Sequence, residues 1–279
     1  MTVLEFTLVI GLVSFAAGLL GALTGLGGGV VLVPVLALAF GVDLHYAIGA
    51  SLVSVIATSS GAAAAYVREG YSNIRVGMFL EIATSIGAIL GAFLATRIQA
   101  GSIAIVFGIV LLYSAWQSFA AQPHHDEPAT RPSRWGTLLK MDSTYPAPEG
   151  PRPYRVQSVP LGFGLMAGAG TLSGLLGIGS GALKVLAMDR AMHLPFKVST
   201  TTSNFMIGVT AAASAGIYLS RGYVDPGLSM PVMLGVLSGS LLGARVLMQA
   251  RIRTLRMVFS AVIVVMAIEM IWKAVGGGW

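Results

Sequence analysis

The tract Gly25-Leu26-Gly27-Gly28-Gly29 interrupts a long apolar segment of the chain. A second tract, Gly177-Ile178-Gly179-Ser180-Gly181, follows it at a shift of 152 residues. Each tract precedes an apolar run, Val30–Phe40 or Ala182–Met192, about half as long as the roughly 20 residues needed to cross a bilayer. Short apolar runs beside glycine are typical of re-entrant or broken helices in membrane proteins, and we expect such helices here.

The composition also favours a membrane protein. Of the 279 residues, 55% are hydrophobic and 10% are charged, and the mean hydropathy is +0.81. Ordinary soluble domains have about 25% charged residues. These values exclude a soluble globular protein, a disordered chain and a nucleic-acid binder. The chain has no cysteine, which excludes disulfides, thiolate metal sites and cysteine nucleophiles.

Eight further stretches are apolar and long enough to span a membrane, and their pattern is helical rather than alternating. They are Phe6–Leu23, Ala47–Val67, Val76–Thr96, Ile103–Ala120, Val159–Leu176, Thr200–Leu219, Leu228–Met248 and Leu255–Ala274. We therefore predict an all-α polytopic membrane protein. A hydroxyl at Ser199 or Thr200 is expected to cap its helix.

The two halves of the chain are a repeat. At the 152-residue shift Ser51 falls on Ser203 and Thr58 on Thr210, and many glycines stay in register. We predict a first membrane repeat at 1–121, a polar, proline-rich linker, extended in places, at 122–158, and a second repeat at 159–279. Each repeat has about four to five helical segments, including a glycine-rich broken or re-entrant hairpin. The number of crossings per repeat is odd, so the repeats are predicted to be inverted.

Basic residues predict the orientation in the membrane. With the linker in the cytoplasm, only Arg97, Arg221 and Lys273 lie outside, and Arg245 can extend inward. The cytoplasmic set is Arg68, Arg75, Arg131, Arg134, Lys140, Arg152, Arg155, Arg190, Lys197, Arg251, Arg253 and Arg256. By the positive-inside rule, both termini are expected to be external and the linker cytoplasmic.

The half-length runs would place two helix N-termini near the membrane midplane. Free N–H groups and the positive end of the helix dipole favour an anion there. The predicted substrate-binding residues are Gly27, Gly28, Gly29, Ser51, Gly179, Ser180, Gly181, Lys184, Ser203 and Asn204. The alternative is that the glycines only permit close helix packing, which we favour for Gly87 and Gly91.

Lys184 supports an anion site, because a cation deep in a membrane is costly unless it has a partner. The alternative is that Lys184 extends to the membrane interface. Ser203 and Asn204 lie too far into their helix to be simple caps. Glu81 and Glu269 are candidate proton carriers, although both lie near expected interfaces and are interpreted as solvated glutamates.

No catalytic motif or metal site is predicted, and no cofactor is expected. His124-His125-Asp126-Glu127 is interpreted as a solvated part of the linker. Without a P-loop, any transport is not driven by ATP hydrolysis in this chain.

The first tract with Pro34, the stretch Gly49-Ala50-Ser51-Leu52, the second tract and the stretch 202–210 (TSNFMIGVT) together resemble the sulfite exporter TauE/SafE family. The resemblance covers both halves but not the linker. It implies a multi-pass permease of the bacterial inner membrane, built of inverted repeats, that moves sulfite or related sulfur-containing anions and organosulfonates. Between the two copies, Gly28 becomes Ser180 and Pro34 becomes Leu186.

We therefore expect a secondary transporter, not an enzyme, that exports a small sulfur-containing anion by alternating access. A cation-coupled permease for another solute and a membrane-embedded enzyme are the alternatives. The expected partners are the anion and the lipid bilayer, without nucleic acid, and a homodimer is left open.

Overall fold

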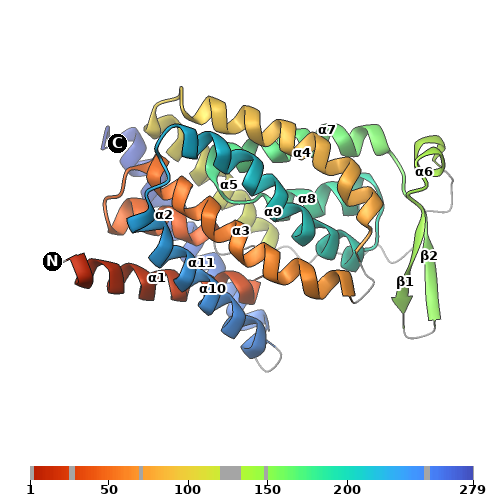
Figure 1. The fold of residues 1–279 in the computed structure, drawn as a ribbon, viewed down its shortest axis with the longest axis horizontal. Helices are drawn as coiled ribbons and strands as arrows, with labels where there is room; N and C mark the ends of the chain where they lie inside the picture. Colours follow the sequence, from red (N-terminus) through yellow and green to blue (C-terminus); the bar gives the residue numbers. More distant parts are fainter. Residues whose placement is uncertain are drawn as a thin grey trace.

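The computed structural model describes residues 3–24, 29–68, 72–119, 133–147, 150–247 and 252–278. Helices form nearly all of this part of the chain and run roughly along one long direction (Figure 1). The first half contains α1 (Val3–Thr24), α2 (Gly29–Ala39), α3 (Leu44–Arg68), α4 (Ile74–Ala95) and α5 (Ala100–Phe119). The second half contains α7 (Val159–Leu176), α8 (Gly181–Leu186), the π-helical turn η1 (Ala187–Ala191), α9 (Phe196–Ser220), α10 (Pro226–Leu247) and α11 (Ile252–Val275).

The prediction of a helical protein is confirmed, and the described structure is nearly all-α, with a pair of strands in the linker. Every predicted apolar stretch falls on a helix, and the two half-length runs coincide with α2 and with α8 plus η1. By length and composition, α4 and α7 each suffice to cross a membrane among the described residues, and shorter apolar stretches lie in α1, α2, α3, α5 and α10. The cap predicted at Ser199 or Thr200 is wrong, because α9 already begins at Phe196, directly after Pro195.

Helices of one half pack against helices of the other. α1 lies along α10 and α4 along α7, while α3 packs on α9 and α5 on α11. The bounds recur at the 152-residue shift: α3 corresponds to α9 and α4 to α10, residue for residue. At this shift α1 corresponds to α7 and α10 corresponds to α4. The α1–α10 pair and the α7–α4 pair are therefore equivalent in the repeat.

Glycines allow the α4–α7 pair to come together backbone to backbone. A Cβ atom added at Gly91 would lie 2.0 Å from the Thr171 carbonyl oxygen, and one at Gly87 would lie 2.2 Å from that of Ala167. From the other side, a Cβ at Gly174 would lie 2.0 Å from the Ala88 carbonyl oxygen. The interpretation of Gly87 and Gly91 as packing glycines is confirmed.

The described part of the linker folds into a small unit. It contains α6 (Arg134–Leu138) and two antiparallel strands, β1 (Ser143–Ala147) and β2 (Gly150–Tyr154). The extended chain predicted from its prolines is present as these paired strands. In Figure 1 the strands lie at the right end of the molecule, and both chain termini lie at the left end.

Asn73 attaches this linker unit to the helices. Its side-chain oxygen accepts from the Val76 N–H at the start of α4 (3.1 Å). Its amide nitrogen donates to the Met141 carbonyl oxygen (2.9 Å) and the Tyr154 hydroxyl (2.7 Å). Burial raises the pKa of the Tyr154 hydroxyl, and the hydrogen bond with Asn73 opposes that shift.

The close α4–α7 contact predicts opposite effects of two matched substitutions in α7. Gly174→Ala should lower the unfolding free energy by about 1–3 kcal/mol, because the methyl group must displace the α4 backbone. Gly168→Ala should be neutral or stabilising by up to about 1 kcal/mol, because nothing lies within 4 Å of its added Cβ and alanine favours helix. Thermal unfolding in detergent measures both changes. Equal stability of the two variants would contradict the close contact.

The contacts of Asn73 predict that Asn73→Ala loosens both the linker unit and the start of α4. The lost helix cap alone costs about 1 kcal/mol. Faster amide hydrogen exchange at 74–77 and 143–154 is the expected result. The pKa of the Tyr154 hydroxyl is raised in the folded state. The neutral Tyr154 therefore contributes its full stabilisation below pH 10.0, the ordinary pKa of tyrosine, and this stabilisation is lost as the pH rises further. Unchanged exchange in Asn73→Ala would show that the linker is held elsewhere.

Candidate functional site

The two glycine tracts begin the short helices α2 and α8. Gly27 and Gly28 lie outside the described residues, and Gly29 is the first residue of α2. In the second tract, Gly177 and Gly179 have φ values of +69° and +71°, which glycine adopts without strain. Ser180 also has a positive φ, +46°, although it carries a side chain. Its hydroxyl is buried without a hydrogen-bond partner in the structure.

The first residue of α2 lies against the end of α7. A Cβ atom added at Gly29 would lie 2.7 Å from the Ser51 Oγ and 3.2 Å from the Gly177 carbonyl oxygen. The Ser51 hydroxyl itself donates to that carbonyl oxygen (2.8 Å). Residues 126 positions apart in the sequence therefore connect the two halves at this point.

Ser203, the repeat counterpart of Ser51, bonds within its own half. Its hydroxyl donates to the carbonyl oxygen of Gly181 (3.2 Å), at the start of α8. Ser51 and Ser203 are both buried, and Asn204 is half-buried one residue further along α9. In this conformation both serine hydroxyls are used by backbone carbonyl groups, so an anion would have to compete with the tracts for them.

Lys184 is fully buried, with 0% of its surface exposed. Its ammonium group donates to the Thr210 Oγ1 on α9. The alternative in which this lysine extends to the membrane interface is therefore wrong. Since α8 starts at Gly181 and α9 packs directly on it, the side chain points into protein instead of along the helix toward lipid headgroups.

Glu81 is the charged partner that the sequence analysis missed. Only 7% of its surface is exposed, so the interpretation as a solvated glutamate is wrong. Its Oε1 accepts from the Thr210 hydroxyl (2.7 Å) and from the Ser85 hydroxyl (3.0 Å). Its Oε2 is buried without a hydrogen-bond partner in the structure. Glu269 is exposed on α11, as expected for a solvated residue.

Glu81, Ser85, Lys184 and Thr210, here called the buried charge cluster, join α4, α8 and α9. The Thr210 hydroxyl stands between the two charged groups, accepting from Lys184 and facing Glu81. It has a single proton, and the Met206 carbonyl oxygen is a second acceptor within reach (3.0 Å). The hydrogen bonds of the cluster can therefore rearrange when the charge of one member changes.

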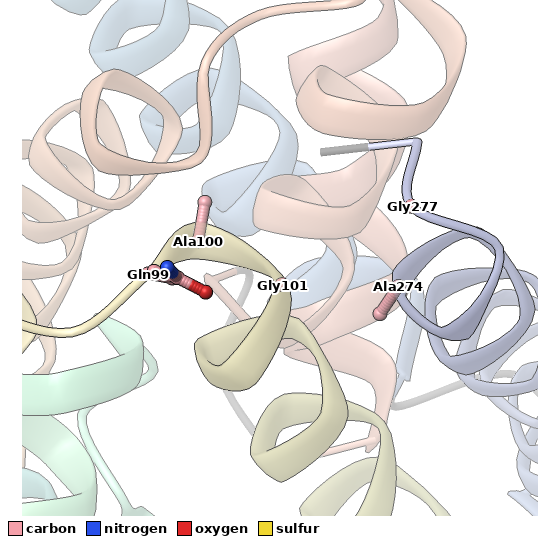
Figure 2. Close-up of a pocket in the computed structure, with 5 residues that line it drawn as sticks. All are labelled: Gln99, Ala100, Gly101, Ala274 and Gly277. Carbon is pink, nitrogen blue, oxygen red and sulfur yellow. The ribbon is translucent and has the colours of Figure 1, made fainter.

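A hollow of about 470 Å³ lies elsewhere, between the start of α5 and the end of α11 (Figure 2). Gln99, Ala100, Gly101, Ala274 and Gly277 line it. None of these residues is charged or belongs to the predicted anion site. The hollow is therefore not the anion site predicted from the sequence. His124-His125-Asp126-Glu127 lies outside the described residues.

Comparisons with known proteins agree with this architecture. The chain is 28% identical over 276 residues to the "Probable membrane transporter protein YunE" of Bacillus subtilis, covering 96% of this chain and 97% of that protein. It is 26% identical over 284 residues to the "Probable membrane transporter protein MJ0441" of Methanocaldococcus jannaschii, covering 96% and 97%. No solved structure matches the chain.

The family model described as "Sulfite exporter TauE/SafE" matches residues 10–270, which include both glycine tracts and the buried charge cluster. The match confirms the resemblance carried by the tracts and by the residues around Ser51 and Ser203. The chain therefore belongs to the sulfite exporter TauE/SafE family of membrane transporters.

Proposed function

We propose that this protein is a secondary transporter that moves sulfite, or a related small sulfur-containing anion, across the bacterial inner membrane. The observation that carries the proposal is the fully buried Lys184 next to two glycine tracts that meet between the halves. A fully buried cation requires negative charge nearby. Glu81 supplies it through Thr210 in the described conformation, and a substrate anion would take that place when bound. Sulfite is proposed as the anion because it is named in the description of the family.

The outer surface of the helix bundle supports insertion in a bilayer. One side of α4 exposes a row of large apolar side chains, which water would not tolerate but lipid would. They are Met78, Ile82, Ile86, Ile89, Leu90 and Phe93. The arrangement in Figure 1, with the termini at one end and the linker at the other, is compatible with external termini and a cytoplasmic linker.

Inverted repeats would give this transporter two similar conformations. The exchange of helix pairs between the halves supports a pseudo-twofold relation, which alternating access requires. In the described conformation Gly29 packs against Val55 and Gly181 against Ile207, so no open space lies beside these two glycines. Access from either side would need the tracts to separate, which would release the hydroxyls of Ser51 and Ser203 to the anion.

Lys184 would supply the positive charge of the site, and the N–H groups at the start of α2 would supply neutral donors. The corresponding residue in the first half is Leu32, so the site has one cation. A single cation matches a substrate with a small negative charge. It also means that the two glycine tracts are not equivalent in substrate binding.

Substitution of Lys184 tests the proposal. Lys184→Leu introduces the residue that the first half already has at the corresponding position, and it should raise the apparent KM for anion flux by about 10- to 100-fold. That range corresponds to the loss of one hydrogen bond to a charged group. Flux of radiolabelled sulfite and methanesulfonate into liposomes that contain the purified protein measures the effect.

Lys197→Leu, at an exposed lysine of α9, is the matched control and should leave flux unchanged. Equal flux through Lys184→Leu and the unsubstituted protein would contradict a binding role for Lys184. Absence of anion flux with both probes in the unsubstituted protein would contradict the proposed function as a whole.

A further inference from the structure

The buried charge cluster joins α4 of the first half to α8 and α9 of the second half, and it has no counterpart at the equivalent place in the repeat, which is formed by α10, α2 and α3. At the 152-residue shift, Glu81 corresponds to Met233, Ser85 to Leu237 and Lys184 to Leu32. Thr210 alone keeps its identity, as Thr58, whose hydroxyl bonds to carbonyl oxygens of its own helix (3.0 and 3.2 Å). The equivalent helices α10, α2 and α3 therefore carry apolar side chains at the positions of Glu81, Ser85 and Lys184. The fold does not require these charged and polar side chains. Because burying them costs free energy, their presence indicates a functional role.

One of the two carboxylate oxygens of Glu81 has hydrogen-bond donors among the described residues, and the other has none. Two hydroxyls donate to Oε1, while Oε2 is buried and accepts from no group among the described residues. An ionised carboxylate with an unpaired buried oxygen is costly, and a proton on that oxygen removes the charge. Oε2 is an acceptor atom of Glu81 that meets no donor in the described part of the chain.

Lys184 is the cation that hydrogen bonds connect to Glu81 in the described part of the chain. α7, which packs along α4, has no ionisable side chain. α9 carries Lys197 in its first turn and Tyr218 near its end, and η1 carries Asp189 and Arg190. Arg75, in the first turn of α4, donates to the Lys140 carbonyl oxygen in the linker.

We propose that Glu81 binds a proton that crosses the membrane together with the substrate anion. This inference rests on the proposed function, and it names the coupling ion. Without substrate, the ionised Glu81 balances the charge of Lys184 through Thr210. A proton from water that binds Oε2 turns the carboxylate into a neutral carboxylic acid. The Lys184 ammonium then lacks a counter-charge and takes the anion.

The net charge of the cluster is zero in both resting and loaded states, provided that one proton accompanies each monovalent anion. An anion without the proton would place two negative charges beside one cation in an apolar site, which costs free energy. Anion and proton therefore raise each other's affinity, as linkage requires. On the opposite side, release of the anion and of the proton restores the ion pair. An anion that accumulates in the cell would leave with a proton.

The test uses purified full-length protein in liposomes and methanesulfonate, whose single charge does not titrate near neutral pH. With the membrane voltage set to zero, a difference of about one pH unit should drive about tenfold accumulation of the anion on the alkaline side, because the proton gradient is then tenfold. A pH-sensitive dye inside the liposomes should report one proton per anion. Anion flux without proton movement would overturn the inference and leave the proposed function intact.

Glu81→Gln keeps the shape of the side chain and removes the proton site. It should still exchange labelled for unlabelled methanesulfonate, while accumulation driven by the pH difference falls to about onefold. Glu269→Gln, at the exposed glutamate of α11, is the matched control and should keep both activities. Proton-driven accumulation that survives in Glu81→Gln would overturn the inference.

Two measurements do not depend on how well Glu81→Gln folds. The first is the proton-to-anion ratio of the unsubstituted protein. The second is the partial recovery of coupling in Glu81→Asp. Recovery is expected, because aspartate can also bind a proton. Absence of both methanesulfonate and sulfite flux in the unsubstituted protein would instead refute the proposed function, and the inference with it.

Discussion

The architecture depends on backbone-to-backbone contact between helices of different halves. Lipid tails are as apolar as leucine, so a helix in a bilayer gains little by hiding apolar side chains and must instead gain close packing. Gly87 and Gly91 on α4 approach the backbone of α7, Gly170 and Gly174 on α7 approach the backbone of α4, and Gly235 and Gly239 on α10 approach the α1 backbone in the same way. These contacts hold the two halves against each other. Gly29 and the second glycine tract lie where the halves meet, as the Ser51–Gly177 hydrogen bond shows.

Much of the helical architecture followed from the sequence. Apolar length predicted the long helices, and the 152-residue repeat predicted that α2 has its counterpart in α8 and η1. These features are local, because an apolar run forms its own backbone hydrogen bonds wherever it lies. Helix starts were less certain, as α9 shows by beginning at Phe196, ahead of the expected hydroxyl cap. The folded hairpin of the linker was foreseen only as extended chain, because its pairing depends on contacts between residues.

The candidate site was predicted less completely. Ser51, Ser203 and the second tract could be found because the repeat marks them twice. Glu81 was not connected with Lys184, since 103 residues separate them in the chain and they have no counterparts in the other half. Comparison of the halves carries the missing signal. Met233 and Leu32 show that apolar residues can fill the positions equivalent to Glu81 and Lys184. Packing alone therefore does not explain why these two positions carry charged residues.

Asn73 bonds to three parts of the protein at once. Its backbone N–H donates to the Thr202 hydroxyl on α9 (3.0 Å), while its side chain holds the first turn of α4 and two residues of the linker. Through Asn73, the linker is therefore hydrogen-bonded to the helix bundle as well as joined to it along the chain. A rocking motion of one half must either carry the hairpin with it or break this junction. The hydrogen bonds of Asn73 therefore tie α4, α9 and the linker together at one end of the bundle.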